Sequence, residues 1–163
     1  MNTTALDDLR LMSLEQLERC YAAAHKNVLI SLPTGCFEGF LLARLTNRGA
    51  RRLSVRASEA FAFKLFSFGI DFDAGSWFFG PTRLRIGRFV ADIGPSHWRD
   101  VSTVVRLRYT PSRLPFRHLL YDEVTPLGPS LCLGLGGLDA ERGEGDHFFF
   151  ALSRSLAGDQ HQA

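Results

Sequence analysis

The side chains best suited to chemistry are a few polar groups set among apolar residues of predicted strands. Tyr109 shares a strand face with apolar residues, so its hydroxyl needs a polar partner on that side. Asp122 and Glu123 are adjacent in the following predicted strand, where neighbouring residues face opposite sides. They therefore form no carboxylate dyad. One of the two is expected to point inward, towards a ligand or a structural arginine, and the sequence leaves open which one.

Arg88 is a second candidate, because strand parity between residues 82 and 93 places it on a largely apolar, inward face. The residues of that face are Leu84, Ile86, Arg88, Val90 and Asp92. A buried charge needs a partner, and Asp92 or Asp122 would supply it. Two interpretations remain. Either the strand end lets the charged side chains reach solvent, or Arg88 anchors an acidic head group in an apolar cavity.

Lys64 lies in an apolar segment of a chain that has 19 basic residues and only two lysines, Lys26 and Lys64. A desolvated lysine has a lowered pKa and acts as a base or forms a Schiff base. Alternatively, its stem covers apolar surface while its amine reaches water. The catalytic candidates are Lys64, Tyr109, Asp122 and Glu123. The ligand-binding candidates are Trp77, Arg88, Tyr109 and Asp122.

Signatures of metal and cofactor sites are missing from the sequence. Cys20, Cys36 and Cys132 are odd in number and share no metal-ligand spacing, so we interpret them as reduced thiols. The five histidines are scattered and form no zinc signature. The glycines of residues 134–137 do not have the spacing of a dinucleotide-binding loop. We therefore expect no metal and no cofactor.

The charge balance argues against a nucleic-acid-binding protein. The formal net charge is +2, from 19 basic and 17 acidic residues, which is too balanced for a chain that mainly holds a phosphate backbone. The outward faces of predicted strands do carry four arginines that would form a basic stripe for a nucleic acid or a partner: Arg83, Arg85, Arg106 and Arg108. Nucleic-acid binding favours exposed aromatic residues between such arginines, and we expect none there.

Length and hydropathy indicate a single domain. We expect one domain over residues 1–163, with residues 1–12 and 157–163 frayed. The first residues lack a basic segment and an apolar stretch, and no apolar run is long enough to span a bilayer. We therefore expect no signal peptide, no membrane span and a cytoplasmic location. The oligomeric state cannot be predicted from the sequence.

The hydropathy pattern predicts a mainly β protein. Ser13 and Gln16 form a capping box for a short amphipathic helix that ends near His25. A second helical segment is predicted near residues 51–62, running into a strand near Lys64, although its last part fits a strand almost as well. About seven or eight short strands follow one another elsewhere. This pattern favours an antiparallel barrel or a strongly curved sheet.

The segment Gly35-Cys36-Phe37-Glu38-Gly39, which follows the predicted N-terminal helix and opens the first strand, resembles the Gly-x-Trp-x-Gly opening of the calycins: lipocalins, fatty-acid-binding proteins and nitrobindins. Phe37 stands where those families usually have tryptophan. The resemblance implies a small barrel with an internal ligand. Because nitrobindin-like barrels ligate haem through a late histidine, it also makes His147 the position of a haem ligand, were one bound. The whole chain also looks like small bacterial proteins, a likeness that implies no activity.

These observations favour binding of a hydrophobic small molecule, such as a lipid, fatty acid or terpenoid, in a phenylalanine-rich interior. The chain has 14 phenylalanines, which supply apolar surface without a polar group. Cys132, Gly134 and Gly136 share one strand face and would leave room for a ligand if that face points inward. The alternative is a cofactor-free isomerase or cyclase that uses the same cavity, with one acid or base to move a proton.

Overall fold

Nine strands and two helices make up the part of the chain that the computed structural model describes, which covers residues 5–27, 30–48, 51–56, 68–80, 82–101, 103–109, 120–138 and 147–154. The helices are α1 (Leu6–Leu11) and α2 (Leu14–Asn27). The strands are β1 (Cys36–Arg48), β2 (Arg51–Arg56), β3 (Phe68–Asp71), β4 (Ser76–Phe79), β5 (Leu84–Gly94), β6 (Val104–Tyr109), β7 (Leu120–Gly128), β8 (Leu131–Leu138) and β9 (His147–Ser153).

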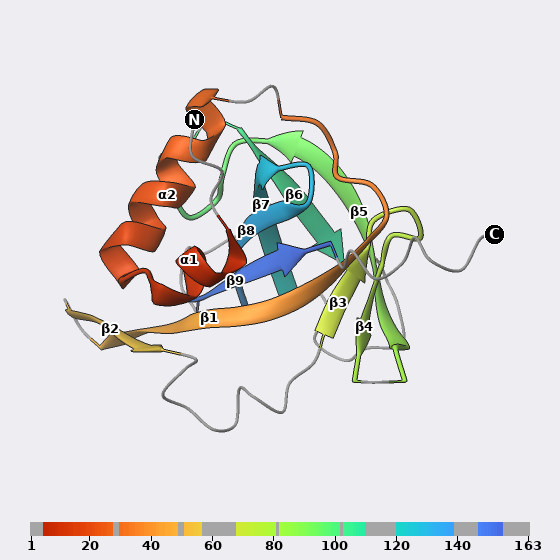
Figure 1. The fold of residues 1–163 in the computed structure, drawn as a ribbon, viewed down its shortest axis with the longest axis horizontal. Coiled ribbons are helices and arrows are strands. Elements are labelled where there is room, and N and C mark those ends of the chain that lie inside the picture. The colour runs from red at the N-terminus through yellow and green to blue at the C-terminus, as the bar shows by residue number, and fades with distance from the viewer. Residues whose placement is uncertain are drawn as a thin grey trace.

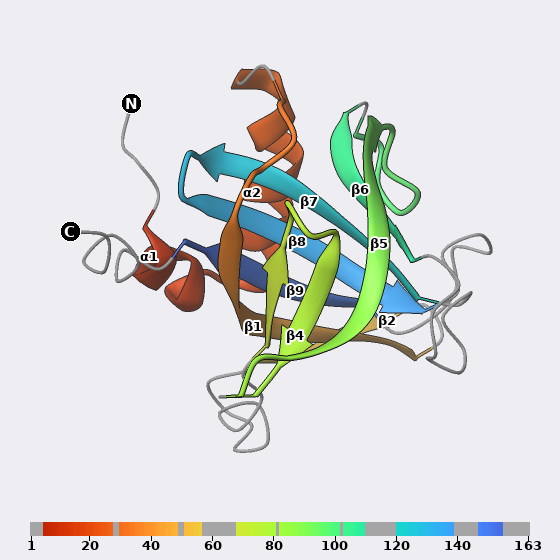
Figure 2. The same ribbon diagram turned by 90° about the vertical axis from the view of Figure 1, so that its right-hand side faces the viewer.

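All these strands except β2 close into an antiparallel barrel (Figure 1 and Figure 2). From β3 to β9 each strand pairs with the next along the chain, and β1 joins the two ends of this series by pairing with both β3 and β9. The remaining strand, β2, pairs with the second half of β1. The antiparallel barrel and its predicted number of strands are thereby confirmed.

Apolar residues fill two cores, one on each side of the barrel wall. Phe37, Phe89 and Phe150 belong to the inner core, which the closed sheet surrounds. Tyr21 and Leu133 belong to the outer core, where α1 and α2 cover the outer face of the wall on one side of the barrel (Figure 1). The strands therefore bury both of their faces where the helices lie.

The N-terminal helices begin as their local sequence dictates. The backbone N–H of Ser13 donates to Gln16 Oε1 at 2.6 Å, and the backbone N–H of Gln16 donates to Ser13 Oγ at 3.2 Å. This confirms the predicted capping box of α2. Helix α1 forms within residues 1–12, the segment expected to fray, and its Leu9 is buried against the outer core.

Among the described residues, no helix combines the length and the apolarity needed to cross a bilayer.

The prediction of a second helix near residues 51–62 is wrong for its first part. Residues 51–56 form β2, which pairs in register with β1 from Ala43 opposite Arg56 to Arg48 opposite Arg51. Leu53 and Val55 alternate with polar residues, and this spacing of two suits a strand that the edge of β1 can pair with. Residues 57–67, which include Lys64, lie outside the described residues.

A bulge in β5 changes which of its residues face inward. Gly87 pairs with Trp77 and Arg85 pairs with Phe78, so Ile86 has no partner across β4. An extra residue of this kind reverses the in–out alternation beyond it. From Gly87 onward, odd-numbered residues of β5 therefore face the barrel interior.

A second bulge, at Leu42 in β1, has the same effect. Leu41 pairs with Phe150 and packs against the inner core, but Ala43 pairs with Phe149 in the outer core. The first half of β1 therefore lines the barrel interior with its odd-numbered residues, and its second half turns them towards the helices.

Gly134 should be intolerant of a side chain. A Cβ atom there would overlap the ring of Phe150, which is itself 1% exposed and cannot move into solvent. We expect Gly134→Ala to lower the free energy of unfolding by about 1–3 kcal/mol, the usual effect of overpacking a core. Urea unfolding of the two proteins would measure this difference.

Gly128→Ala is the matched control, because no heavy atom lies within 4 Å of the Cβ position there. Its effect should stay within about 0.5 kcal/mol, as for other substitutions that meet no neighbour. Equal stability of the two variants would show that the space above Gly134 is not filled.

Candidate functional site

Tyr109 and Asp122 form a hydrogen-bonded pair inside the barrel. The Tyr109 hydroxyl, at the end of β6, donates to Asp122 Oδ2 on the neighbouring strand β7. Leu107, which pairs directly with Asp122, and Phe89, which pairs with Tyr109, both belong to the inner core. Strand register therefore places both polar groups on the inner face, as the sequence predicted for Tyr109 and for one of the two adjacent acids.

Six aromatic rings continue from this pair around the inner wall, and each centroid lies within 6.5 Å of the next. In order they are Tyr109, Trp77 (6.1 Å), Phe79 (4.3 Å), Phe68 (6.5 Å), Phe150 (5.9 Å) and Phe148 (5.8 Å). Phe148, the last ring of the series, lies close to Asp122, where the series began. Both lie above Gly136, because a Cβ atom added to this glycine would overlap Asp122 Oδ1 and the ring of Phe148. The carboxyl group thus lies within a ring of aromatic side chains.

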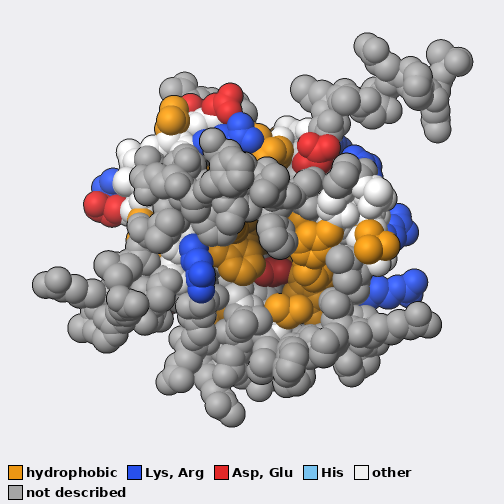
Figure 3. All heavy atoms as spheres, turned by 90° about the horizontal axis from the view of Figure 1, so that it is seen from below, with side chains coloured by type: hydrophobic (Ala, Val, Ile, Leu, Met, Phe, Trp, Pro, Cys, Tyr) orange, Lys and Arg blue, Asp and Glu red, His pale blue; other side chains and the backbone are white. Residues whose placement is uncertain are grey.

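The residues of the pair lie towards one end of the barrel. Trp77, Tyr109, Asp122 and Phe148 are half-buried although they face the interior, whereas Phe150, nearer the middle of β9, is buried. Figure 3 views the end of the barrel at which β4 is followed by β5, and it shows a hollow there. Hydrophobic side chains flank this hollow, an acidic side chain is visible between them, and a Lys or Arg side chain lies beside it. We call this hollow the aromatic recess.

The environment of the pair shifts both of its pKa values. Burial raises the pKa of Asp122 to about 7, the Tyr109 hydrogen bond opposes this rise, and the nearby charge of Glu123 adds to it. Burial and the Asp122 carboxylate raise the pKa of Tyr109 well above its usual value. Near neutral pH the tyrosine is therefore a hydrogen-bond donor, and Asp122 exists in both protonation states.

Trp77 occupies its place because Gly87 leaves room for it. A side chain at Gly87 would overlap the indole nitrogen of Trp77 on the neighbouring strand. Trp77 Nε1 is buried and has no hydrogen-bond partner among the described residues. The glycine beside the β5 bulge was a signal in the sequence for such a close approach.

Glu123, the other predicted acid, lies on the outer face of the wall and is fully buried. Its carboxylate accepts hydrogen bonds from Ser96 Oγ, the backbone N–H of His97 (3.2 Å) and the Tyr121 hydroxyl (3.0 Å). Burial and the charge of Glu123 raise the pKa of Tyr121. Glu123 therefore holds the segment after β5 against β7 and does not face the aromatic recess.

Arg88 does not face the interior, so the parity prediction is wrong for this residue. It pairs with Ser76 across β4 and is exposed on the outer face, beyond the bulge at Ile86. The anchor expected for an acidic head group is thus outside the barrel. The other candidate cation, Lys64, lies outside the described residues, and so does the side chain of His147.

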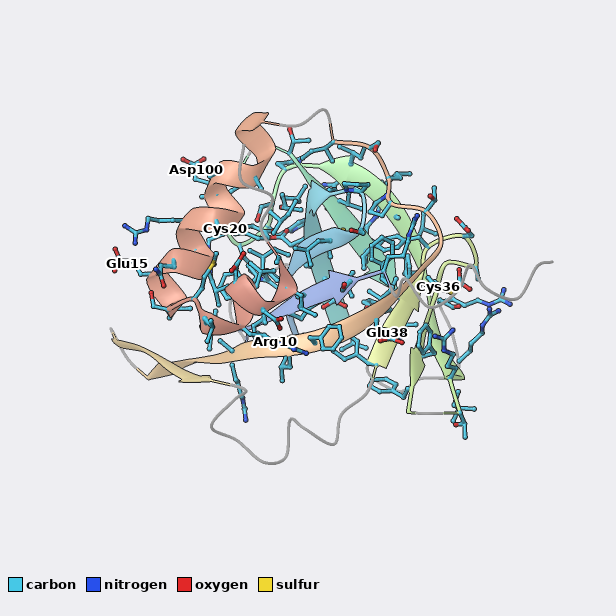
Figure 4. All side chains as sticks on the ribbon, viewed as in Figure 1. Arg10, Glu15, Cys20, Cys36, Glu38 and Asp100 are labelled. Carbon is cyan, nitrogen blue, oxygen red and sulfur yellow. The ribbon has the colours of Figure 1, made fainter. Side chains whose placement is uncertain are left out.

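The four outward arginines lie beside three carboxylates, which offset part of their charge locally. The pairs are Arg83 with Glu38 (3.7 Å), Arg85 with Asp71 (2.9 Å), Arg106 with Asp92 (2.8 Å) and Arg108 with Asp92 (2.5 Å). Glu38 is labelled on the side of β1 that faces away from the barrel interior (Figure 4). The four arginines face outward as expected, but the carboxylates beside them interrupt the predicted basic stripe.

Sequence reasoning missed most of the aromatic residues of the recess. Trp77, Tyr109 and Asp122 are among the candidates predicted from the sequence, but Phe68, Phe79, Phe148 and Phe150 are not. Cys132, Gly134 and Gly136 face inward as their shared strand face suggested, but Phe150, Phe148 and Asp122 occupy the space above the two glycines. Within the described part of the chain, no cluster of three or more His, Cys, Asp or Glu side chains is arranged to hold a metal ion.

Comparison with known proteins assigns no family to the chain. No protein-family model matches it, and neither the curated proteins nor the solved structures include a significant match.

Replacing Asp122 should change how stability depends on pH. A folded-state pKa of about 7, above the unfolded value near 3.8, means that stability is greatest at low pH and falls as pH rises from about 4 to 7. Asp122→Asn has no charge to bury, so at pH 8 it should be more stable than the natural protein by up to about 4 kcal/mol, since each unit of pKa shift corresponds to about 1.36 kcal/mol. The difference should disappear near pH 4.

Urea unfolding between pH 4 and 8 would measure this, with Asp100→Asn as the control. Asp100 is exposed, and its side chain points away from the barrel beside α2 (Figure 4). That variant should follow the natural protein at every pH. If Asp122→Asn also follows it, the Asp122 carboxyl does not titrate as its burial implies.

Proposed function

We propose that the chain binds a small, largely apolar molecule in the aromatic recess, with one polar group of that molecule held by Tyr109 and Asp122. The observation that carries the proposal is a hydrogen bond between two half-buried residues, Tyr109 and Asp122, that lie among aromatic side chains of the barrel interior. Ligand pockets commonly combine apolar walls with a few polar groups that set orientation. Barrels of about eight strands are also wide enough to hold one small ligand.

The resemblance to calycins supports the same proposal. Gly35 to Gly39 match the opening of the first calycin strand, and Phe37, which stands at the usual tryptophan position, is buried in the inner core. The closed antiparallel barrel is the architecture that this resemblance implies. A calycin-like protein that binds a lipid or a terpenoid would use its interior in this way.

The polar groups of the recess favour a hydrogen-bond donor over a fatty-acid carboxylate. Arg88 lies on the outer face and so provides no anchor for a carboxylate in the recess, whereas the recess does contain the Tyr109 hydroxyl and the Asp122 carboxyl group. A terpenoid alcohol suits them, because its hydroxyl can donate to Asp122 and its chain can lie against the phenylalanine rings. Geraniol is therefore the probe that we choose.

Trp77 provides a direct test of binding. The chain has two tryptophans, and Trp98 packs against the outer core, so Trp98→Phe leaves Trp77 as the only indole. Titration with geraniol should change Trp77 fluorescence in a saturable manner. In the converse variant, Trp77→Phe, the fluorescence of Trp98 should not change.

Tyr109→Phe would then show whether the polar pair takes part. Loss of the hydroxyl should weaken geraniol binding by about threefold to tenfold, the effect of one neutral hydrogen bond. If geraniol produces no response at Trp77, and calorimetry detects no heat, the proposed binding function fails.

A cofactor-free isomerase or cyclase is the second candidate function, because Asp122 is a carboxyl group with a pKa near neutrality in an apolar site. Such a group is suited to general acid–base catalysis, which commonly contributes about 10²–10⁴-fold. An enzyme of this kind should accelerate exchange of the acidic C–H protons of 2-tetralone with deuterated water. NMR would follow the exchange, and the Asp122→Asn variant should lose the acceleration. Exchange no faster than in buffer would leave binding as the function.

A further inference from the structure

We propose that the end of the β1–β2 hairpin binds double-stranded DNA by entering its major groove. This hairpin end, which we call the basic ribbon, consists of residues 46–56. The basic ribbon uses other residues than the aromatic recess, so the proposal does not depend on what the recess binds.

The basic ribbon has the backbone of a two-stranded extension of the barrel wall. Leu45 is the last residue of β1 that pairs with β9. Beyond it, the strand that pairs with β1 in the described part of the chain is β2, up to Arg48 opposite Arg51. Figure 1 shows this end of β1 and β2 reaching out beyond the other strands of the barrel. A two-stranded antiparallel ribbon is narrow enough to enter the major groove of B-DNA.

The sequence of the basic ribbon concentrates positive charge. Its arginines are Arg48, Arg51, Arg52 and Arg56. No Asp or Glu occurs between residues 39 and 58 of the sequence. The preceding acid, Glu38, lies ten residues before Arg48 on the same strand, which is about 30 Å of extended chain, and it is paired with Arg83. The net charge of +2 for the whole chain therefore conceals one segment in which neighbouring acids do not offset the arginines.

Elsewhere on the described surface, acids and arginines occur together. The four outward arginines discussed above lie beside carboxylates, and the acids of α1 and α2 have arginine partners of their own. The helix acids and their partners are Asp7 with Arg10 (3.2 Å), Glu15 with Arg19 (3.5 Å) and Glu18 with Arg99 (2.7 Å). The basic ribbon differs in having four arginines and no acid within its own strands. Such a segment complements the phosphate backbone of a nucleic acid, since guanidinium groups match phosphate oxygens in geometry as well as in charge.

The strand register places arginines on both faces of the basic ribbon. Residues directly opposite each other share a face of a sheet, and so do alternate residues of one strand. Arg56 pairs with Ala43 of the outer core, so Arg56 and Arg52 lie on the face of Ala43. Arg48 and Arg51 pair with each other on the opposite face. A flat anionic membrane would meet one face, whereas a ribbon inside a groove has phosphates on both sides. This arrangement therefore favours a duplex as the partner.

Fluorescence anisotropy of the full chain with a fluorescein-labelled DNA duplex of about 20 base pairs tests the proposal. At a slope of about 0.9 for each phosphate contact, four contacts should weaken binding by about 100-fold between roughly 50 and 200 mM salt. Arg51→Gln/Arg52→Gln should weaken binding at the lower salt at least tenfold and reduce the slope of log K against log salt by about 2. Arg48→Gln/Arg56→Gln, which removes the other two arginines of the ribbon, should have the same effect.

The matched control is Arg83→Gln/Arg108→Gln. It removes the same charge from two exposed arginines that lie beside Glu38 and Asp92. Its affinity for the duplex should stay within about threefold of that of the parent protein, and circular dichroism should show the same β structure in all these proteins. A duplex RNA of the same sequence should bind more weakly than the DNA, because the major groove of A-form RNA is deep and narrow.

Several results would overturn the proposal. These are an absence of DNA binding at the lower salt, an equal loss in the control variant, or RNA binding as tight as DNA binding. Binding to phosphatidylglycerol vesicles and not to DNA would assign the basic ribbon to a membrane surface instead. The acidic segment at residues 139–146, which joins β8 to β9, is the other possible occupant. If DNA binds only to Glu141→Gln/Glu144→Gln protein, that segment and not DNA is the partner of the ribbon in the natural chain.

Discussion

The pairing of β1 with both β3 and β9, the two ends of the series of strands, is the interaction on which the rest of the structure depends. Its first residues pair with β3 and its central part pairs with β9, so one strand closes the barrel. Closure satisfies the backbone groups that an open sheet would leave at its edges. It also encloses the inner face. Without it, Tyr109 and Asp122 would stand on an open sheet in water, and burial would not raise their pKa values.

The packing of the barrel interior depends on aromatic rings that lie above glycines of neighbouring strands. Phe150 lies above Gly134, and Phe148 and Asp122 lie above Gly136 on the neighbouring strand. Trp77 lies above Gly87 in the same way. A small barrel has room for such rings only where the adjacent position lacks a Cβ. The glycines thus set where these rings fill the interior.

Two adjacent carboxylates have different environments because a strand turns neighbouring side chains to opposite faces. Asp122 faces the barrel interior, where its carboxylate accepts a hydrogen bond from the Tyr109 hydroxyl. Glu123 enters the outer core, where three donors surround it and tie the segment after β5 to the wall. The same alternation therefore places Asp122 beside Tyr109 in the barrel interior and gives Glu123 a structural role in the outer core.

The sequence by itself determined the class of fold, the capping box at Ser13, the inward position of Tyr109 and the presence of one inward acid, because each of these depends on spacing within a single element. The tertiary structure alone decided which acid that is, the outward position of Arg88, the strand at residues 51–56 and the choice of aromatic rings around the recess. Alternation along a strand relates its residues to one another, but an unpaired residue such as Ile86 reverses that alternation. Whether a residue is left unpaired depends on the register between two strands. That register is set only when the barrel closes.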